Sequence, residues 1–402
     1  MRIWRSIFAG AAMLLAVQAD AAPHRVISEN RVNYPLAVGQ LELTETVVQD
    51  GPLAINRFRM HRLRRTNFNA HGAVLLLPSL GNSFRGYLWE ETGDVTKSFA
   101  AYFARAGYEV WGYSPRETGI ATGACGVSLD CSEALNWGMQ TVIDDVTYIR
   151  SRIKTVFPGK DPVIGGLSLG AISAIAVVNQ YPKDYAGLLA WEGSPVSDDP
   201  AVIAHNTGFC NQYSGLVGAG VAVDDQNLPF VKVLAGLART APNDPFVLPV
   251  VGFPPGLTNM QAFVLVMSTP NPVAPSPRPG FITAAGDFLS GQLFFSEKRR
   301  LFAAIAEFND VTANRGGRDY YCSLAGVETV FTSKLSRFRA PVMIIKAGQG
   351  FGTIMDELPG KLSSPSVTMI GINAYAHIDH LGSPLHTLQL ELPILFWLNS
   401  VL

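Results

Sequence analysis

Apolar runs and helix-like periodic segments alternate through the first half of the chain. Short apolar runs bounded by polar or turn residues are typical of buried strands, and they lie at 73–81, 108–119, 161–168 and 186–194. Segments with the apolar spacing of an amphipathic helix lie at 96–107, 141–157 and 169–180. Continuous apolar strands that alternate with helices favour a parallel sheet covered on both faces. The chain is therefore predicted to have an α/β fold with a mostly parallel central sheet.

This alternation stops after about residue 195 and resumes only near residue 338. The intervening segment is rich in glycine and proline but also strongly apolar, and a structureless loop of this length is rare in a compact domain. We therefore expect a core made of 22–195 and 338–402 with an inserted lid, or cap, at 196–337. Two further strands are predicted at 340–348 and 366–372. A final helix follows, in which Pro393 marks a kink or a restart.

The first residues have the features of a secretory signal peptide. Two arginines precede an apolar run at 7–17, and the small-residue series 19–21 follows that run. Cleavage after Ala21 is expected, so the mature chain would start near Ala22 and be secreted or periplasmic. No later segment has about 18 uninterrupted apolar residues, so we expect no integral membrane segment in the mature chain.

Charge and cysteine content narrow the class of protein. The 31 basic and 32 acidic side chains nearly cancel, which argues against a nucleic-acid partner. The densest basic stretch, 57–65, alternates like a strand with one solvated side. Four cysteines in an exported protein favour two disulfides, and sequence alone allows three pairings. We favour Cys125–Cys131, which closes a short loop, and Cys210–Cys322, which joins two parts of the expected lid.

One serine lies between a predicted strand and a predicted helix. The sequence Gly166-Leu167-Ser168-Leu169-Gly170 fits G-x-S-x-G, a pattern that 38 glycines in 402 residues can also produce by chance. The context makes the motif a stronger indication of a nucleophilic serine, because a predicted strand precedes it and a predicted helix follows it. Such a turn presents the Ser168 hydroxyl at the sheet edge, and the helix N-terminus offers the Leu169 N–H to an oxyanion. Ser168 is thus a candidate nucleophile.

A nucleophilic serine needs a histidine that follows it in the chain. The histidines after Ser168 are His205, His377, His380 and His386. The stretch NAYAHIDHLGSP directly follows the predicted strand at 366–372, where a loop at the sheet's carboxyl edge would deliver the base. His377 is nearest that strand and is the preferred base, with His380 as the alternative.

With these residues, the chain resembles the α/β-hydrolase fold, most nearly its lipase and esterase branch with a large cap. The resemblance spans about 45–195 and 338–400. AGYEVWGYSPRETG looks like a family segment in which Arg116 matches the arginine and Glu117 stands where glycine is usual. AHIDHLG is similar to the histidine loop of lid-bearing lipases, and LLLPSLGNS to the oxyanion strand. The resemblance implies that the second oxyanion N–H comes from Leu80.

The carboxylate expected to orient the histidine is missing from its usual place in the resembled family. Most of these families place an aspartate where this chain has Phe351. Two carboxylates could replace it: Glu192, which ends the predicted strand at 186–194, and Asp356, which requires a detour of its loop. Asp379 and the absence of any acid are further alternatives.

Together these residues predict an exported serine hydrolase that cleaves carboxylic esters, either with an apolar acyl group or of an aromatic kind, through an acyl-serine. The alternatives are a lactonase, thioesterase, amidase, peptidase or acyltransferase of the same fold, or a catalytically silent binding protein. No nucleotide-binding glycine motif or HExxH cluster occurs in the sequence, so no cofactor and no metal are expected. The sequence leaves the oligomeric state open.

Overall fold

The computed structural model describes residues 24–89, 93–248, 253–268, 280–284 and 288–402. The expected signal peptide at 1–21 lies outside the described residues.

A nine-stranded sheet forms the centre of the molecule, with the strand order β1-β2-β3-β5-β4-β6-β7-β10-β11. The strands β1, β2, β3 and β5 pair antiparallel, and the sheet is parallel from β5 to β11. Their bounds are β1 Arg25–Pro35, β2 Gln40–Gln49, β3 Arg57–Arg65, β4 Ala73–Leu77, β5 Glu109–Ser114, β6 Val163–Leu167, β7 Gly187–Trp191, β10 Val342–Ala347 and β11 Val367–Ile372. The α/β fold class is confirmed.

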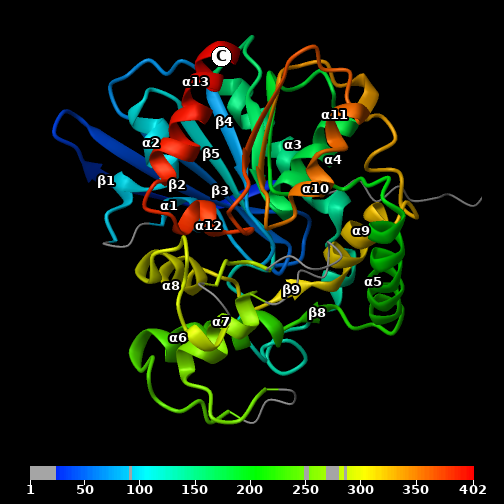
Figure 1. Ribbon diagram of the computed structural model, residues 1–402. Coiled ribbons are helices and arrows are strands. Elements are labelled where there is room, and N and C mark those ends of the chain that lie inside the picture. The colour runs from blue at the N-terminus through cyan, green and yellow to red at the C-terminus, as the bar shows by residue number, and fades with distance from the viewer. Residues whose placement is uncertain (1–23, 90–92, 249–252, 269–279, 285–287) are drawn as a thin grey trace, which may run out of the picture.

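Helices cover both faces of this sheet (Figure 1). One face packs against α1 Arg85–Leu88, α2 Phe99–Arg105 and α13 Leu392–Val401. The other packs against α3 Met139–Val156, α4 Leu169–Gln180, α10 Gly352–Met355 and α11 Leu358–Lys361. Strand β4 shows why both faces need cover, because Val74 and Leu76 face one helix layer while Leu75 and Leu77 face the other. No described helix is both long and apolar enough to cross a bilayer.

Between the end of β7 at Trp191 and the start of β10 at Val342 the described residues lie outside the central sheet, and residues 196–337 of this stretch are hereafter called the insert. Its elements are α5 Pro200–Gly218, β8 Val223–Asp224, α6 Asn227–Thr240, α7 Asn259–Ser268, η3 Phe288–Ser290, α8 Lys298–Ala306, β9 Thr312–Ala313, α9 Asn314–Leu324 and η4 Leu335–Arg337. In Figure 1 α5 to α9 lie beyond the edge where the parallel strands end. Helices α6, α7 and α8 share their own apolar cluster.

Both favoured disulfides are present. Cys210–Cys322 joins α5 to α9 inside the insert, and Cys125–Cys131 closes a loop after β5. The latter loop leads into η2 Ser132–Asn136.

The final helix restarts at its proline. A π-helical stretch at Thr387–Glu391, labelled η5, precedes α13, and Pro393 lies in the first turn of α13. Proline is tolerated there because the first N–H groups of a helix have no intrahelical partner. The remaining short helices are η1 Val95–Lys97 and α12 Asp379–Gly382.

Candidate active site

Ser168 sits on a sharp turn between β6 and α4. Its backbone has φ 59° and ψ −122°, which is outside the regions that non-glycine residues usually occupy. A hydrogen bond of 2.8 Å from Ser168 N to Trp191 O holds this turn against β7. The strained turn lifts Ser168 out of the strand direction and leaves its side chain partly exposed.

The glycines of the motif leave room for neighbouring backbone. A Cβ on Gly166 would lie 2.2 Å from Leu77 O, and one on Gly170 would lie 2.0 Å from the same oxygen. A Cβ on Gly193 would lie 2.2 Å from Ser168 O. Since the clashing atoms belong to the backbone, no side-chain movement can relieve them. Gly166 and Gly170 thus let the turn pack directly against the end of β4, and Gly193 lets the chain after β7 pack against Ser168.

Tyr87 ties the end of β6, which precedes Ser168, to the end of β4. Its buried hydroxyl donates to Leu77 O at 2.8 Å and accepts from Leu167 N at 2.8 Å. These two atoms lie at the ends of β4 and β6, where the strands diverge toward the 78–81 loop and Ser168. Burial raises the pKa of Tyr87, so its hydroxyl keeps its proton and both hydrogen bonds.

His377 and Glu192 meet across the sheet edge, although 185 residues separate them in the sequence. His377 Nδ1 lies 3.2 Å from Glu192 Oε2, and the two side chains are 2% and 0% exposed. A buried carboxylate at Nδ1 leaves Nε2 as the free basic nitrogen of the neutral ring. His377 can therefore act as a base on the side of the ring that points away from Glu192.

Backbone donors hold the Glu192 carboxylate. Ala347 N donates to Oε1, and Phe351 N donates to Oε2 at 2.9 Å. Phe351 stands where the resembled family has its acid, and here it orients the pair instead. Its ring packs against the His377 ring at a centroid distance of 4.0 Å.

The other acids considered from the sequence are engaged elsewhere. Asp356 forms an ion pair with Lys346, its side chain is 46% exposed, and it has no contact with His377. Asp379 is buried and accepts from Ala376 N, Thr283 N, Thr283 Oγ1 and Ser296 Oγ. Asp379 therefore joins the histidine loop to the insert, and none of these hydrogen bonds involves the His377 ring.

His380, the alternative base, is buried in an aromatic environment. Its ring centroid lies 6.0 Å from that of Trp191 and 5.3 Å from that of Tyr375, and neither ring nitrogen has a described partner. Burial, and secondarily the charge of His377, lower the pKa of His380 to about 3. His380 does not line the cavity described next.

A largely apolar cavity of about 180 Å³ opens between the sheet edge and the insert. Ser168 and His377 both line it, together with Leu80 and Leu169. The insert contributes apolar side chains from α6, α7 and α8, including Leu228, Val231, Met267, Leu301 and Ile305. The cavity therefore brings the predicted nucleophile and base to one apolar space.

Two backbone N–H groups border the same space. Within the described chain, neither Leu80 N nor Leu169 N donates a hydrogen bond. No hydrogen bond joins Ser168 Oγ to His377 in the described chain, and such nucleophile–base contacts in enzymes often tighten only when substrate binds. The arrangement gathers the groups that an acyl-transfer site requires: a serine, a histidine, a carboxylate and two backbone N–H donors.

A second serine–histidine pair was not found from the sequence. Ser114 Oγ lies 2.8 Å from His61 Nε2, and Glu45 Oε2 lies 3.6 Å from His61 Nδ1. Ser114 and His61 are each only 1% exposed, and Ser114 Oγ also accepts from Phe84 N at 3.0 Å. Neither residue lines the Ser168 cavity, so the pair holds β3, β5 and α1 together. The pairing of distant strands creates it, and no sequence motif signals it.

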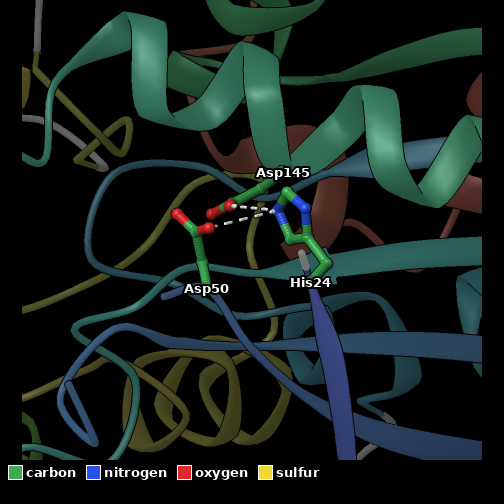
Figure 2. Close-up of side chains that lie close together, drawn as sticks. All are labelled: His24, Asp50 and Asp145. Atoms are coloured by element: carbon green, nitrogen blue, oxygen red, sulfur yellow. Dashed lines mark ion pairs between the residues drawn. The ribbon is translucent and has the colours of Figure 1, made fainter. Parts of the chain in front are cut away.

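One group of described residues could bring ligand atoms to a metal ion: His24, Asp50 and Asp145 (Figure 2). His24 Nε2 lies 3.7 Å from Asp145 Oδ1 and 4.0 Å from Asp50 Oδ1. The Arg116 guanidinium donates to Asp145 Oδ1 at 2.6 Å and to Asp50 Oδ2 at 2.8 Å. Since Arg116 already supplies the positive charge that a metal would bring, the cluster is an ion-pair network that holds the start of β1 against α3.

Comparisons with known proteins found relatives only among solved structures. The chain matches no described protein family and no curated protein. A candidate lipase from Sulfolobus solfataricus aligns with a TM-score of 0.68 at 19% identity, covering 94% of this chain and 99% of that chain. A monoacylglycerol lipase from Paleococcus ferrophilus aligns with a TM-score of 0.47 at 15% identity, covering 86% and 99%. At these identities the similarity concerns the fold.

Proposed function

Because this chain has the α/β-hydrolase fold, we propose that it is a serine ester hydrolase that forms an acyl-enzyme on Ser168. The observation that carries this proposal is the 3.2 Å contact between His377 Nδ1 and the buried Glu192 carboxylate. It supports a Ser168–His377–Glu192 triad, because His377 shares its cavity with Ser168. The positive φ of Ser168 is a second support, since α/β-hydrolase nucleophiles sit on such strained turns.

The proposed reaction has two steps. His377 Nε2 takes the Ser168 proton as Ser168 Oγ attacks the ester carbonyl, and the N–H groups of Leu80 and Leu169 stabilise the oxyanion. The same proton then goes to the departing alkoxide, which leaves as the alcohol. His377 then takes a proton from water, whose oxygen attacks the acyl-serine; the acid is released as His377 returns that proton to the departing Ser168 Oγ. Glu192 fixes the ring orientation and stabilises the protonated imidazole in both steps.

The substrate is proposed to carry an apolar acyl group. The cavity wall consists mainly of aliphatic and aromatic side chains, and its volume of about 180 Å³ suits a short or medium chain or an aromatic ring. The insert supplies much of this wall, which supports its role as a lid. A Cβ on Gly81 would lie 2.0 Å from Leu228 Cδ1, so the insert packs directly on the loop that carries Leu80.

Export is part of the proposal. The arginine, apolar and small-residue series in the first 21 residues is that of a cleaved signal peptide. Two disulfides fit an oxidising compartment, where such bonds persist. A secreted or periplasmic enzyme would meet ester substrates outside the cytoplasm.

A fluorophosphonate probe tests the nucleophile. Wild-type protein should be labelled once per chain, and Ser168→Ala should lose labelling. The matched control is Ser114→Ala, which removes the other serine that contacts a histidine and should keep the label. Labelling that survives in Ser168→Ala, or that disappears only in Ser114→Ala, would refute the assignment.

Turnover of ester substrates tests the reaction class. Nitrophenyl esters of increasing acyl length should be hydrolysed with an optimum at a short or medium chain, since the cavity is small. Lactones, thioesters and anilides with the same acyl groups should react more slowly. A faster rate with any of these would move the assignment to that class.

A further inference from the structure

Glu117 follows β5 at the sheet edge and occupies the place where the resembled family has glycine. Its neighbour Arg116 is fully engaged with Asp145 and Asp50. The Glu117 carboxylate, in contrast, has no side-chain partner in the described part of the chain; it accepts from its own backbone N–H, and the side chain is partly buried. A carboxylate withdrawn from water with so little compensation costs folding free energy. The space beside this carboxylate is therefore of functional interest.

Glu117 lines a second cavity, of about 50 Å³. Five residues form walls of both this cavity and the Ser168 cavity: Ser79, Leu80, Leu169, Ala313 and Gly316. Leu80 and Leu169 are the residues whose N–H groups face the proposed oxyanion. The second cavity therefore adjoins the proposed reaction centre on the side of the 78–81 loop, which carries Leu80. A substrate that extends past this loop would meet Glu117.

The second cavity is more polar than the first and much smaller. Hydroxyl side chains of Ser79, Thr141 and Ser173 line it together with Glu117. Its volume suits a group of about three non-hydrogen atoms, because a single water needs about 10–15 Å³ by this measure. A long acyl chain does not fit there, so the apolar cavity remains the acyl site and the second cavity is left for the alcohol part.

The groups beside Glu117 indicate which polar group fits. Arg116 also lines the cavity, but Asp145 and Asp50 balance its charge. The hydroxyl groups of the wall and the Glu117 carboxyl therefore define the ligand. A hydroxyl can donate to the Glu117 carboxylate and accept from a hydroxyl of the wall. Burial raises the pKa of Glu117 to about 7, and both protonation states of its carboxyl can accept a hydrogen bond.

We propose that the Glu117 cavity is an alcohol subsite that binds a free hydroxyl on the leaving group, so that the preferred substrates are monoesters of diols or polyols. The inference rests on the proposed ester hydrolysis at Ser168. Glu117 is its specificity-determining residue.

Matched ester pairs test the subsite. Butanoate esters of ethane-1,2-diol, propane-1,3-diol and butane-1,4-diol are compared with the propyl, butyl and pentyl esters, in which a methyl group replaces the terminal hydroxyl. For at least one length, wild-type kcat/KM should favour the hydroxyl ester by about tenfold, as expected for one hydrogen bond to a carboxyl. Glu117→Met should abolish this preference, mainly by lowering kcat/KM for the hydroxyl ester.

Two controls make the result decisive. Asp244→Asn removes an exposed carboxylate in the insert and should keep the wild-type preference. Fluorophosphonate labelling of Ser168 separates this inference from the proposed function: an unlabelled wild type would refute both. Labelled wild type without a twofold preference at any length would overturn only the subsite, as would a preference retained in Glu117→Met. If the Met variant does not fold, Glu117→Gln should still reduce the preference at least threefold.

Discussion

At the scale of single residues, backbone strain marks the proposed site. Three described non-glycine residues have positive φ: Asn67, Ser168 and Glu192. Asparagine tolerates this conformation, whereas serine and glutamate adopt it at an energetic cost. Hydrogen bonds of 2.8 Å from Ser168 N to Trp191 O and from Glu192 N to Ile345 O hold both strained residues to neighbouring strands. The strain thus occurs at two of the three residues proposed to act together.

The identity of the acid gives the sharpest test at this scale. Glu192→Gln keeps the size of the side chain but removes the charge that orients His377, so kcat should fall by about 10³- to 10⁴-fold. Asp356→Asn breaks only an exposed ion pair with Lys346 and should leave kcat within about twofold. Steady-state kinetics of both variants decide the question, and the opposite order of effects would assign the acid to Asp356.

Local sequence patterns could indicate Ser168 and His377 as candidates but could not indicate which carboxylate lies beside His377. Ser168 lies in a strand–turn–helix motif, and His377 follows directly on a predicted strand. Which carboxylate reaches His377 Nδ1 depends on which strands are neighbours in the sheet. A local sequence pattern does not contain the order of β7 and β10. The parallel neighbours β7 and β10 place Glu192 next to Ala347 and Phe351, whose N–H groups bind its carboxylate.

At the scale of elements, the loop after β10 must pass very close to the histidine loop. A Cβ on Gly350 would lie 2.5 Å from Glu192 Oε2 and 2.8 Å from His377 N. Gly350→Ala should therefore separate the acid from the base and lower kcat/KM at least about tenfold. Gly360→Ala is the matched control, because a Cβ there meets no described atom within 4 Å. Equal kinetics for the two variants would show that the loop adjusts freely.

Asp379 joins the histidine loop to the insert. Its carboxylate accepts from Thr283 Oγ1 at 2.8 Å, Ser296 Oγ at 2.7 Å and Ala376 N at 2.9 Å. Since all of these partners donate, Asp379→Asn turns an NH₂ group toward donors and should cost about 1–3 kcal/mol of unfolding free energy. Urea unfolding measures this loss, and Asp356→Asn serves as the exposed control with a change below about 0.5 kcal/mol. A loss no larger than that of the control would contradict the anchoring role.

Elements with a clear apolar period were predictable, and elements without one were not. Helix α4 was predicted at its observed bounds, since its apolar run follows directly on Ser168. Strand β1 was missed because nearly all of its residues are exposed, so burial imposes no alternating pattern on them. It forms nonetheless, since ten residue pairs align it antiparallel to β2. The π-helical stretch before α13 was predictable only as an irregularity near Pro393.

At the scale of the whole molecule, buried histidines and buried glutamates make opposite contributions to the pH dependence of the unfolding free energy. Burial lowers the pKa of His61 and His380 to about 3. Between that value and the usual 6.5 the unfolded histidine holds a proton that the folded one lacks, so stability falls as the pH falls. Burial raises the pKa of Glu117 and Glu391 to about 7. From there down to the usual 4.5 the folded carboxyl holds the extra proton, so stability rises as the pH falls.

The two effects overlap between about pH 6.5 and 4.5, where the contributions of these two histidines and two glutamates to the unfolding free energy have opposite signs. Removal of one of the four groups removes its contribution. Relative to wild type, Glu391→Gln should lose stability on acidification through this range, and His61→Gln should gain it, each by about 1 kcal/mol per pH unit. Urea midpoints measured from pH 7 to 4.5 check this. Parallel pH profiles in wild type and both variants would show that these groups do not govern acid stability, whereas changes of opposite sign from the wild-type slope would identify burial as the cause of their shifted pKa values.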